Sequence, residues 1–236
     1  MTYYRAVLVA LQGVAYQLAS TPPNETPQKA RFDANHPWYI RIAPTVMKVQ
    51  APIIWLCALS ELSIALAKPL TAISTPAPSL RVIPNFLYSH RIYTTPMTII
   101  GASLVVFGSL LRLTCFRTLG QLFTFDLTIL PKHILVKSGP YAYVRHPAYT
   151  GSLSMILGLA LVNLTPGSWL SEAGILGRGQ LGIYLRAIGG AMWWLWWLAV
   201  GVKRCRAEDA ELQKTFGKEW EDYANQVRYW FVPGLI

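Results

Sequence analysis

The sequence is poor in charged side chains and in cysteine. Only 14% of its 236 residues are Asp, Glu, Lys or Arg, whereas a soluble domain usually carries about 25%. Hydrophobic residues make up 53% and come in long blocks, which predicts an integral membrane protein. The three cysteines are odd in number and widely spaced, so they predict neither a disulfide framework nor a metal site.

Acidic residues are also scarce, because 11 Asp and Glu stand against 21 Lys and Arg, for a formal net charge of +10. A strongly basic chain often binds nucleic acid. Here the positive side chains lie in connectors and directly after the apolar blocks, as the positive-inside rule predicts for membrane proteins. We therefore expect a lipid bilayer around the chain and no nucleic-acid partner.

Three families of catalytic motif are missing as well. The sequence has no nucleotide-binding glycine-rich loop, no His and Cys residues at metal-ligand spacing, and no Gly-x-Ser-x-Gly elbow. Redox-metal and serine hydrolase chemistry therefore have no support, and we expect no metal.

The apolar blocks predict membrane helices, each of which needs about 20 mostly apolar residues. The fold class expected is all-α, an integral membrane helical bundle of about five transmembrane helices with a cytosolic C-terminal helix. That last helix continues the fifth span without a proline, and Gly217 is its weak point. The predicted spans are residues 6–19, 45–67, 96–115, 150–164 and 181–202.

The first block is short and also fits a signal peptide. No clear cleavage site follows it, so we expect a retained helix. Residues 20–44 and 68–95 are rich in proline and polar residues, which is typical of connectors. A short interfacial piece is expected around Trp38, and residues 124–129 alternate as a strand does.

The Lys and Arg residues that follow the third and fifth predicted helices place both segments on the cytosolic side. Five spans then put residues 20–44 on that side too, so the sequon at Asn24 would stay unmodified. A glycan at Asn24 would overturn this topology. Glu61, inside the second helix, is expected to pair with a neighbour or to lie near an interface, because a lone carboxylate is costly there.

Residues 138–151 concentrate Arg, His, Pro, Tyr and Gly at the start of the fourth helix. Their Gly-Pro pair predicts a turn that brings Tyr141 back toward the membrane. Pro147 biases His146 away from helical geometry and can open the helix itself, so His146 lies where free backbone N–H groups can donate hydrogen bonds to an anion. The alternative is interfacial anchoring, for which Tyr and Arg are common.

Arg204 and Glu208 form a second group, four residues apart and therefore on one helical face. An arginine at the headgroup level can hold a carboxylate substrate through a bidentate pair, and the glutamate can hold an amino group or a sugar hydroxyl. The alternative is a charged helix face that is simply solvated. Residues 1–115 are accordingly expected to form N-terminal helices and connectors, and residues 116–236 the catalytic region.

At these residues the sequence resembles the isoprenylcysteine carboxyl methyltransferases and their integral-membrane relatives. The family pattern is His-x-Leu-Val, Ser-Gly-x-Tyr and Arg-His-Pro-x-Tyr-x-Gly, then an Arg, an acidic pair and Phe-Gly-x-Glu-Tyr. This chain reads HILV, SGPY and RHPAYTG between residues 133 and 151, and FGKEW from residue 216. Two positions depart from the pattern: Asp209 replaces the second Glu, and Trp220 replaces the Tyr.

The resemblance implies carboxyl methylation of a C-terminal prenylcysteine, on a prenylated protein, with S-adenosylmethionine as the methyl donor. It implies a location in the endoplasmic reticulum membrane with the catalytic face in the cytosol. It also implies that Arg204 contacts the substrate carboxylate and that Arg204 and Glu208 are the catalytic residues. The residues implied to hold the donor are His133, Leu135, Val136, Tyr141, His146, Pro147, Tyr149 and Glu208.

Two other functions stay open from the sequence. The chain could methylate another lipid or a small thiol, but such acceptors must lose a proton, and the region offers few unpaired bases besides His146. It could also be a non-catalytic scaffold or a small-solute transporter, which would not bind S-adenosylmethionine. Polar residues on facing helices would favour a transporter, and only Glu61 qualifies.

Overall fold

The structure, a computed structural model, describes residues 2–26, 37–73, 92–128, 130 and 133–235. Over these residues it is a helical bundle without a strand, and Thr128 is an isolated bridge residue. The all-α fold class predicted from the sequence is confirmed. The strand-like alternation expected near Thr128 is instead a loop that follows the third long helix.

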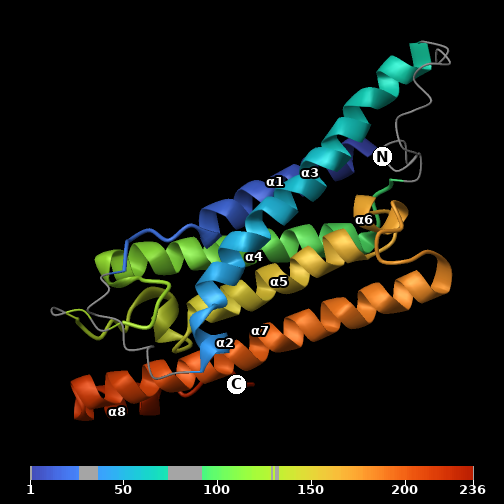
Figure 1. The fold of residues 1–236 in the computed structure, drawn as a ribbon. Coiled ribbons are helices and arrows are strands. Elements are labelled where there is room, and N and C mark those ends of the chain that lie inside the picture. The colour runs from blue at the N-terminus through green and yellow to red at the C-terminus, as the bar shows by residue number, and fades with distance from the viewer. Residues whose placement is uncertain (1, 27–36, 74–91, 129, 131–132, 236) are drawn as a thin grey trace.

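Five long helices carry the fold and correspond to the five apolar blocks (Figure 1). They are α1 (Thr2–Ser20), α3 (Ala43–Ile73), α4 (Pro96–Leu119), α5 (Pro147–Leu164) and α7 (Gly179–Phe216). Short elements lie between the long helices: α2 (Trp38–Arg41), the 3₁₀ turns η4 (Gly120–Leu122) and η5 (Gly139–Ala142), and α6 (Trp169–Glu172). The short helix α8 (Lys218–Gln226) follows α7. α4 packs against α5 and α1, α1 also against α3, and α7 runs along α5.

Within the described residues, four segments are long and apolar enough to cross a membrane, as expected of an integral membrane protein. The four are Ala43–Leu66, Pro96–Leu122, Pro147–Glu172 and Gly179–Phe216. The first predicted span, residues 6–19, lies in the helix α1, which is not among these four. Polar residues such as Arg5 and Gln12 lower the mean hydropathy of α1. Both side chains are fully buried against the other helices rather than exposed to lipid.

Two glycine pairs bring α4 and α5 into backbone contact. A Cβ atom added to Gly108 would lie 2.4 Å from the carbonyl oxygen of Gly151, and one added to Gly101 would lie 2.7 Å from that of Gly158. Small residues of this kind let membrane helices approach closely. Gly101 and Gly108 therefore allow α4 and α5 to approach closely.

The structure shifts several predicted helix boundaries. α3 continues to Ile73 instead of ending at residue 67, and residues 74–91 of the predicted connector lie outside the described residues. The predicted weak point Gly217, with φ of +53°, separates α7 from α8. The short helix α6 was not predicted. Ser168 caps its start, because the Ser168 hydroxyl accepts a hydrogen bond from the backbone N–H of Ser171.

Candidate active site

His146 occupies the position directly before α5, as its proximity to Pro147 predicted. Its backbone N–H donates to the carbonyl of Trp230 at 3.0 Å, and that of Arg145 donates to the carbonyl of Tyr229 at 2.9 Å. The segment after α8 therefore lies along the start of α5 and fixes its conformation.

Two carboxylates of α7 hold the two ring nitrogens of His146. Nε2 lies 2.9 Å from Oδ1 of Asp209, and Nδ1 lies 3.3 Å from Oε2 of Glu208. The second oxygen of Asp209 accepts a hydrogen bond from Nε1 of Trp230 at 2.8 Å and lies 3.5 Å from the guanidinium of Arg145. The ring is only 5% exposed, so this is a buried ionic network.

The surroundings of His146 keep its ring charged. Burial by itself lowers the pKa of His146, but contacts with Cys205, Asp209 and Glu208 outweigh burial and raise the pKa well above 6.5. The ring is therefore an imidazolium at neutral pH. An imidazolium has no free lone pair, so His146 cannot act as a general base in this arrangement.

Arg204 reaches the same network from one turn earlier on α7. Its Nε donates to the hydroxyl of Tyr149 at 2.9 Å, and that hydroxyl donates to Glu208. Its other two nitrogens donate to the carbonyls of Ile40 at 2.9 Å and Phe125 at 2.6 Å. All three acceptors are uncharged, so these hydrogen bonds position the buried guanidinium without neutralising it.

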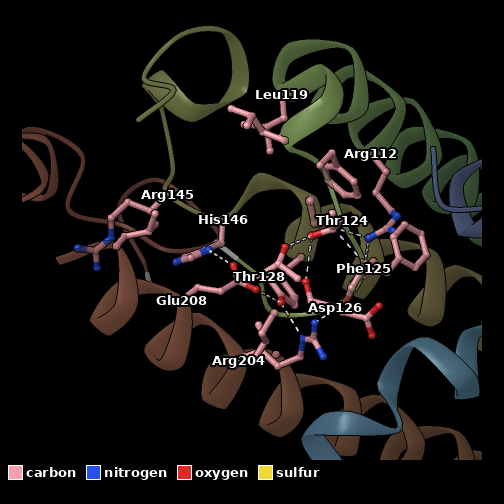
Figure 2. A pocket seen from close by; sticks show the side chains of 18 of the residues that line it. Arg112, Leu119, Thr124, Phe125, Asp126, Thr128, Arg145, His146, Arg204 and Glu208 are labelled. Carbon is pink, nitrogen blue, oxygen red and sulfur yellow. Dashed lines mark hydrogen bonds and ion pairs between the residues drawn. The ribbon is translucent and has the colours of Figure 1, made fainter. Parts of the chain in front are cut away.

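A cavity of about 190 Å³ lies between the start of α5, the second half of α7 and the loop after α4 (Figure 2). It brings together every predicted site residue except one. Pro147 does not line it and is instead buried at the first position of α5. The predicted residues that line the cavity are His133, Leu135, Val136, Tyr141, His146, Tyr149, Arg204 and Glu208.

The segment with His133 and Tyr141 forms another wall of the cavity. Burial lowers the pKa of His133, so its imidazole is neutral at neutral pH. Its Nδ1 is enclosed and has no hydrogen-bond partner among the described residues, which makes it a place where a polar ligand could bind. The hydroxyl of Tyr223 in α8 donates to the carbonyl of Tyr141 at 2.8 Å and ties this wall to the C-terminal helix.

Three residues that shape the site were missed from the sequence. Arg112 of α4 and Phe125 of the following loop both line the cavity, and Asp209, seen only as a departure from the family pattern, is a principal partner of His146. The available signal for Arg112 was a charge inside an apolar block. Within the described parts of the chain, no three His, Cys, Asp or Glu side chains gather as metal ligands would.

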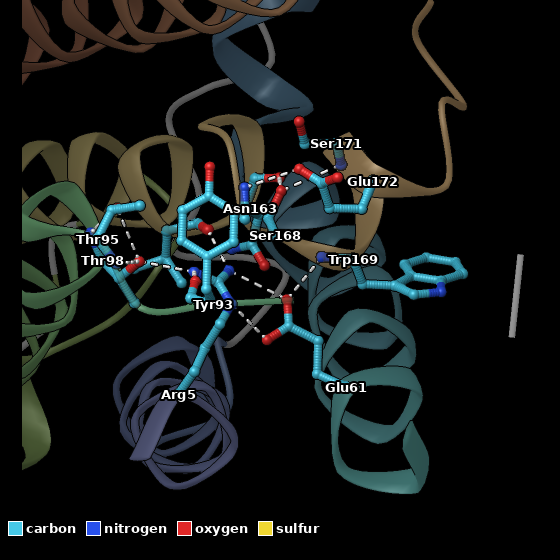
Figure 3. Close-up of polar contacts among 12 residues, drawn as sticks. Arg5, Glu61, Tyr93, Thr95, Thr98, Asn163, Ser168, Trp169, Ser171 and Glu172 are labelled. Carbon is cyan, nitrogen blue, oxygen red and sulfur yellow. Dashed lines mark hydrogen bonds and ion pairs between the residues drawn. The ribbon is translucent and has the colours of Figure 1, made fainter. Parts of the chain in front are cut away.

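A second polar cluster lies at the opposite end of the bundle (Figure 3). Glu61 of α3 forms two hydrogen bonds with Arg5 of α1, of 2.7 and 3.0 Å. Arg5 also donates to the hydroxyl of Thr98 in α4 and to the carbonyl of Val162 in α5. The expectation that Glu61 pairs with a neighbour is confirmed, and the cluster links four helices.

Comparison with known proteins agrees with the resemblance. Residues 99–170 match the family model described as the isoprenylcysteine carboxyl methyltransferase (ICMT) family. The protein-S-isoprenylcysteine O-methyltransferase of Saccharomyces cerevisiae is 27% identical over 143 residues, which are 60% of this chain and 51% of that protein. The protein-S-isoprenylcysteine O-methyltransferase B of Arabidopsis thaliana is 26% identical over 129 residues, 54% of this chain and 55% of the relative.

The protein-S-isoprenylcysteine O-methyltransferase of Dictyostelium discoideum is 29% identical over 139 residues, 58% of this chain and 49% of the relative. The chain thus spans about half the length of the curated relatives it matches. The resemblance to this family that the sequence motifs predicted is confirmed over residues 99–170.

Proposed function

We propose that this chain, whose residues 99–170 belong to the isoprenylcysteine carboxyl methyltransferase family, methylates the carboxylate of a lipophilic acceptor, a C-terminal prenylcysteine. The methyl donor proposed is S-adenosylmethionine. The observation that supports this most directly is one buried network in which both ring nitrogens of His146 are held by carboxylates while Arg204 lines the same cavity.

A carboxylate acceptor suits this network because it needs no base. A carboxyl group is ionised at neutral pH, whereas an ammonium or a thiol must first lose a proton. His146 cannot remove that proton, since its raised pKa keeps the ring charged. The neutral His133 is the remaining imidazole of the cavity wall, so the experiment below includes acceptors that would need a base.

Arg204 is proposed to hold the acceptor carboxylate. A guanidinium has five N–H donors, and the hydrogen bonds to Tyr149, Ile40 and Phe125 use three of them. The others can hold one carboxylate oxygen while the second oxygen stays free to react. Fixing the acceptor in this way can lower the barrier by several kcal/mol through orientation alone.

The donor is proposed to bind between the His133 segment, the start of α5 and Glu208. When bound, it supplies an electrophilic methyl group on a sulfonium. The rings of Tyr141 and Tyr149 can attract that cation, and the unpartnered Nδ1 of His133 supports a polar ligand here. The donor-holding residues proposed are His133, Leu135, Val136, Tyr141, His146, Pro147, Tyr149 and Glu208.

We further propose that the protein lies in the endoplasmic reticulum membrane with the cavity end of the bundle facing the cytosol. The side-chain amide of Asn24 donates to the carbonyls of Gly120 and Phe123 at 2.8 and 2.9 Å, which ties the sequon to the loop after α4. An unglycosylated Asn24 on the cytosolic side is consistent with these bonds. Residues 116–236 are proposed as the catalytic region and residues 1–115 as supporting helices and connectors.

The test is transfer of a labelled methyl group from S-adenosylmethionine by the purified protein in membranes. Acetyl-farnesylcysteine, phosphatidylethanolamine and a small thiol are compared as acceptors. We expect transfer to acetyl-farnesylcysteine alone, as a methyl ester that alkali hydrolyses. Transfer to either other acceptor but not to this one would overturn the proposed acceptor. A protein that does not bind the donor would instead be a scaffold or transporter.

A further inference from the structure

Arg112 places a second buried cation on the wall of the cavity, inside the apolar length of α4. Its side chain is 5% exposed, and it lies within the span Pro96–Leu122. A charge at such a position is costly, and it normally faces protein or an aqueous cavity and marks a function. The sequence motifs described above do not include Arg112.

The hydrogen bonds of Arg112 account for only part of its donors. Nε donates to the carbonyl of Ala19 at 2.9 Å, and Nη1 donates to the hydroxyl of Ser152 at 2.6 Å and the carbonyl of Ala148 at 3.3 Å. Among the described residues, Nη2 has no partner and no carboxylate pairs with this guanidinium. Its positive charge is therefore not compensated by these contacts.

The unused nitrogen, Nη2, belongs to a side chain that lines the cavity. The rings of Phe116 and Phe125 lie 5.4 and 5.0 Å from the guanidinium carbon and restrict its orientation. Figure 2 shows Arg112 beside Phe125 on this wall.

Phe125 also connects the two buried arginines. Its ring packs against Arg112, and its carbonyl accepts a hydrogen bond from Arg204 at 2.6 Å. One cavity is thus lined by two cations whose hydrogen bonds go to uncharged oxygens, and the carboxylates of Asp126 and Glu208 line it as well. An anion inside the cavity would complete both sites, since a charge-assisted pair is stronger than a bond to a neutral oxygen.

We infer that Arg112 is a second carboxylate-binding residue of this cavity, acting alongside Arg204. The inference rests on the proposed function, because that reaction brings two carboxylates to the site. One belongs to the acceptor and the other to the amino-acid part of the donor. Either carboxylate can accept hydrogen bonds from Nη2.

A purely structural role would have a different signature. The bonds from Arg112 to Ala19 and Ser152 tie α4 to α1 and α5, so its loss will also lower stability. Lower stability, however, does not change how strongly the folded protein prefers an acid over its neutral analogue. The preference for the charged ligand is therefore the measurement that separates binding from folding.

The experiment measures binding to the full-length protein in lipid nanodiscs with two pairs of ligands. One pair is acetyl-farnesylcysteine and its carboxamide, and the other is S-adenosylmethionine and its decarboxylated form. The variant is Arg112→Gln, and the control is Arg117→Gln, an exposed arginine on the same helix. We expect Arg112→Gln to lower the preference for the acid about tenfold to a hundredfold in one of the two pairs. The affected pair shows whether Arg112 binds the carboxylate of the acceptor or that of the donor. Arg117→Gln should leave both preferences unchanged.

An unchanged preference in both pairs would overturn the inference. Should Arg112→Gln not fold, Arg112→Lys is measured in its place. Lysine keeps the positive charge, but its compact ammonium cannot reach α1, α5 and a ligand at once. Arg112→Lys should lower the preference for the acid over its neutral analogue several-fold, and an unchanged preference would again overturn the inference. A wild-type protein that binds neither acid refutes the proposed function itself, and the inference falls with it.

Discussion

At the residue scale, the proposed division of labour between Arg204 and the donor site can be tested directly. Arg204→Ala is expected to lower kcat by about a hundredfold or more, since it removes the group that holds the acceptor. Donor binding should largely survive, because the His133 segment remains. Methyl transfer and calorimetric titration with S-adenosylmethionine measure the two effects, with the exposed Lys214→Gln as a control on the same helix. Equal loss of turnover and donor binding would contradict this role.

The charge on His146 predicts a pH dependence of stability. Its pKa is raised in the folded protein, so the resulting stabilisation is complete below about pH 6.5, the unfolded value, and is lost as the pH rises through the folded pKa. The difference in Tm between wild type and His146→Gln should therefore shrink from neutral to alkaline pH. Thermal unfolding across that range measures it.

Asp209→Asn provides the comparison for this pH dependence. It removes one of the two carboxylates that favour the imidazolium and so lowers the pKa of His146. The loss of stabilisation should then begin at a lower pH than in the wild type. Coincident pH profiles of the two proteins would show that Asp209 does not set the charge of this ring.

The sequence predicted some site residues for reasons that hold locally. Pro147 placed His146 before α5, and the four-residue spacing put Arg204 and Glu208 on one face. The sequence did not predict that Asp209 holds the ring of His146. Adjacent residues on a helix point in different directions, and which of them faces His146 depends on the rotation of α7, which tertiary packing sets. Arg112 was missed for a similar reason, since its partners come from α1 and α5.

At the scale of the elements, the α4–α5 contact depends on glycine. Gly108→Ala is expected to destabilise the protein by about 1–3 kcal/mol through overpacking, since the new methyl group meets the carbonyl of Gly151. The matched control is Gly189→Ala in α7, where no atom lies within 4 Å and better helix propensity should leave stability unchanged or higher. Unfolding of both variants in detergent measures the difference, and equal effects would argue against the backbone contact.

The long helices could be predicted because their apolar length is a local property, while the short ones could not. α6 depends on the cap at Ser168 and on a backbone N–H of Trp169 that donates to Glu61 from another helix. α1 was predicted as a span, yet its Arg5 and Gln12 are used for contacts inside the bundle. Hydropathy alone does not show which polar residues will find such partners.

At the scale of the whole molecule, the proposed orientation can be tested by cysteine accessibility. The three native cysteines are buried, so an introduced cysteine should react over a low background. Glu25 is adjacent to Asn24, which bonds to the loop after α4 at the cavity end, so Glu25→Cys introduces a cysteine there. Leu176→Cys introduces one in the connector between α6 and α7, and α6 bonds through Trp169 to Glu61 of the cluster at the other end (Figure 1). In sealed microsomes an impermeant thiol reagent should label the first directly and the second only after permeabilisation. The reverse pattern would place the cavity in the lumen.

The pairing of residues 145–150 with residues 229–231 also bears on the order in which the protein is assembled. Thr150 donates to the carbonyl of Phe231, which the ribosome adds 81 residues later. α4 and α5 precede that point and can already close on their glycines while synthesis continues. The start of α5, however, must wait for α7 to enter the bilayer and for residues 229–231 to arrive. A nascent chain would thus hold paired helices but not the proposed donor site, so under the proposed function it could not consume methyl donor before its synthesis has passed residue 231.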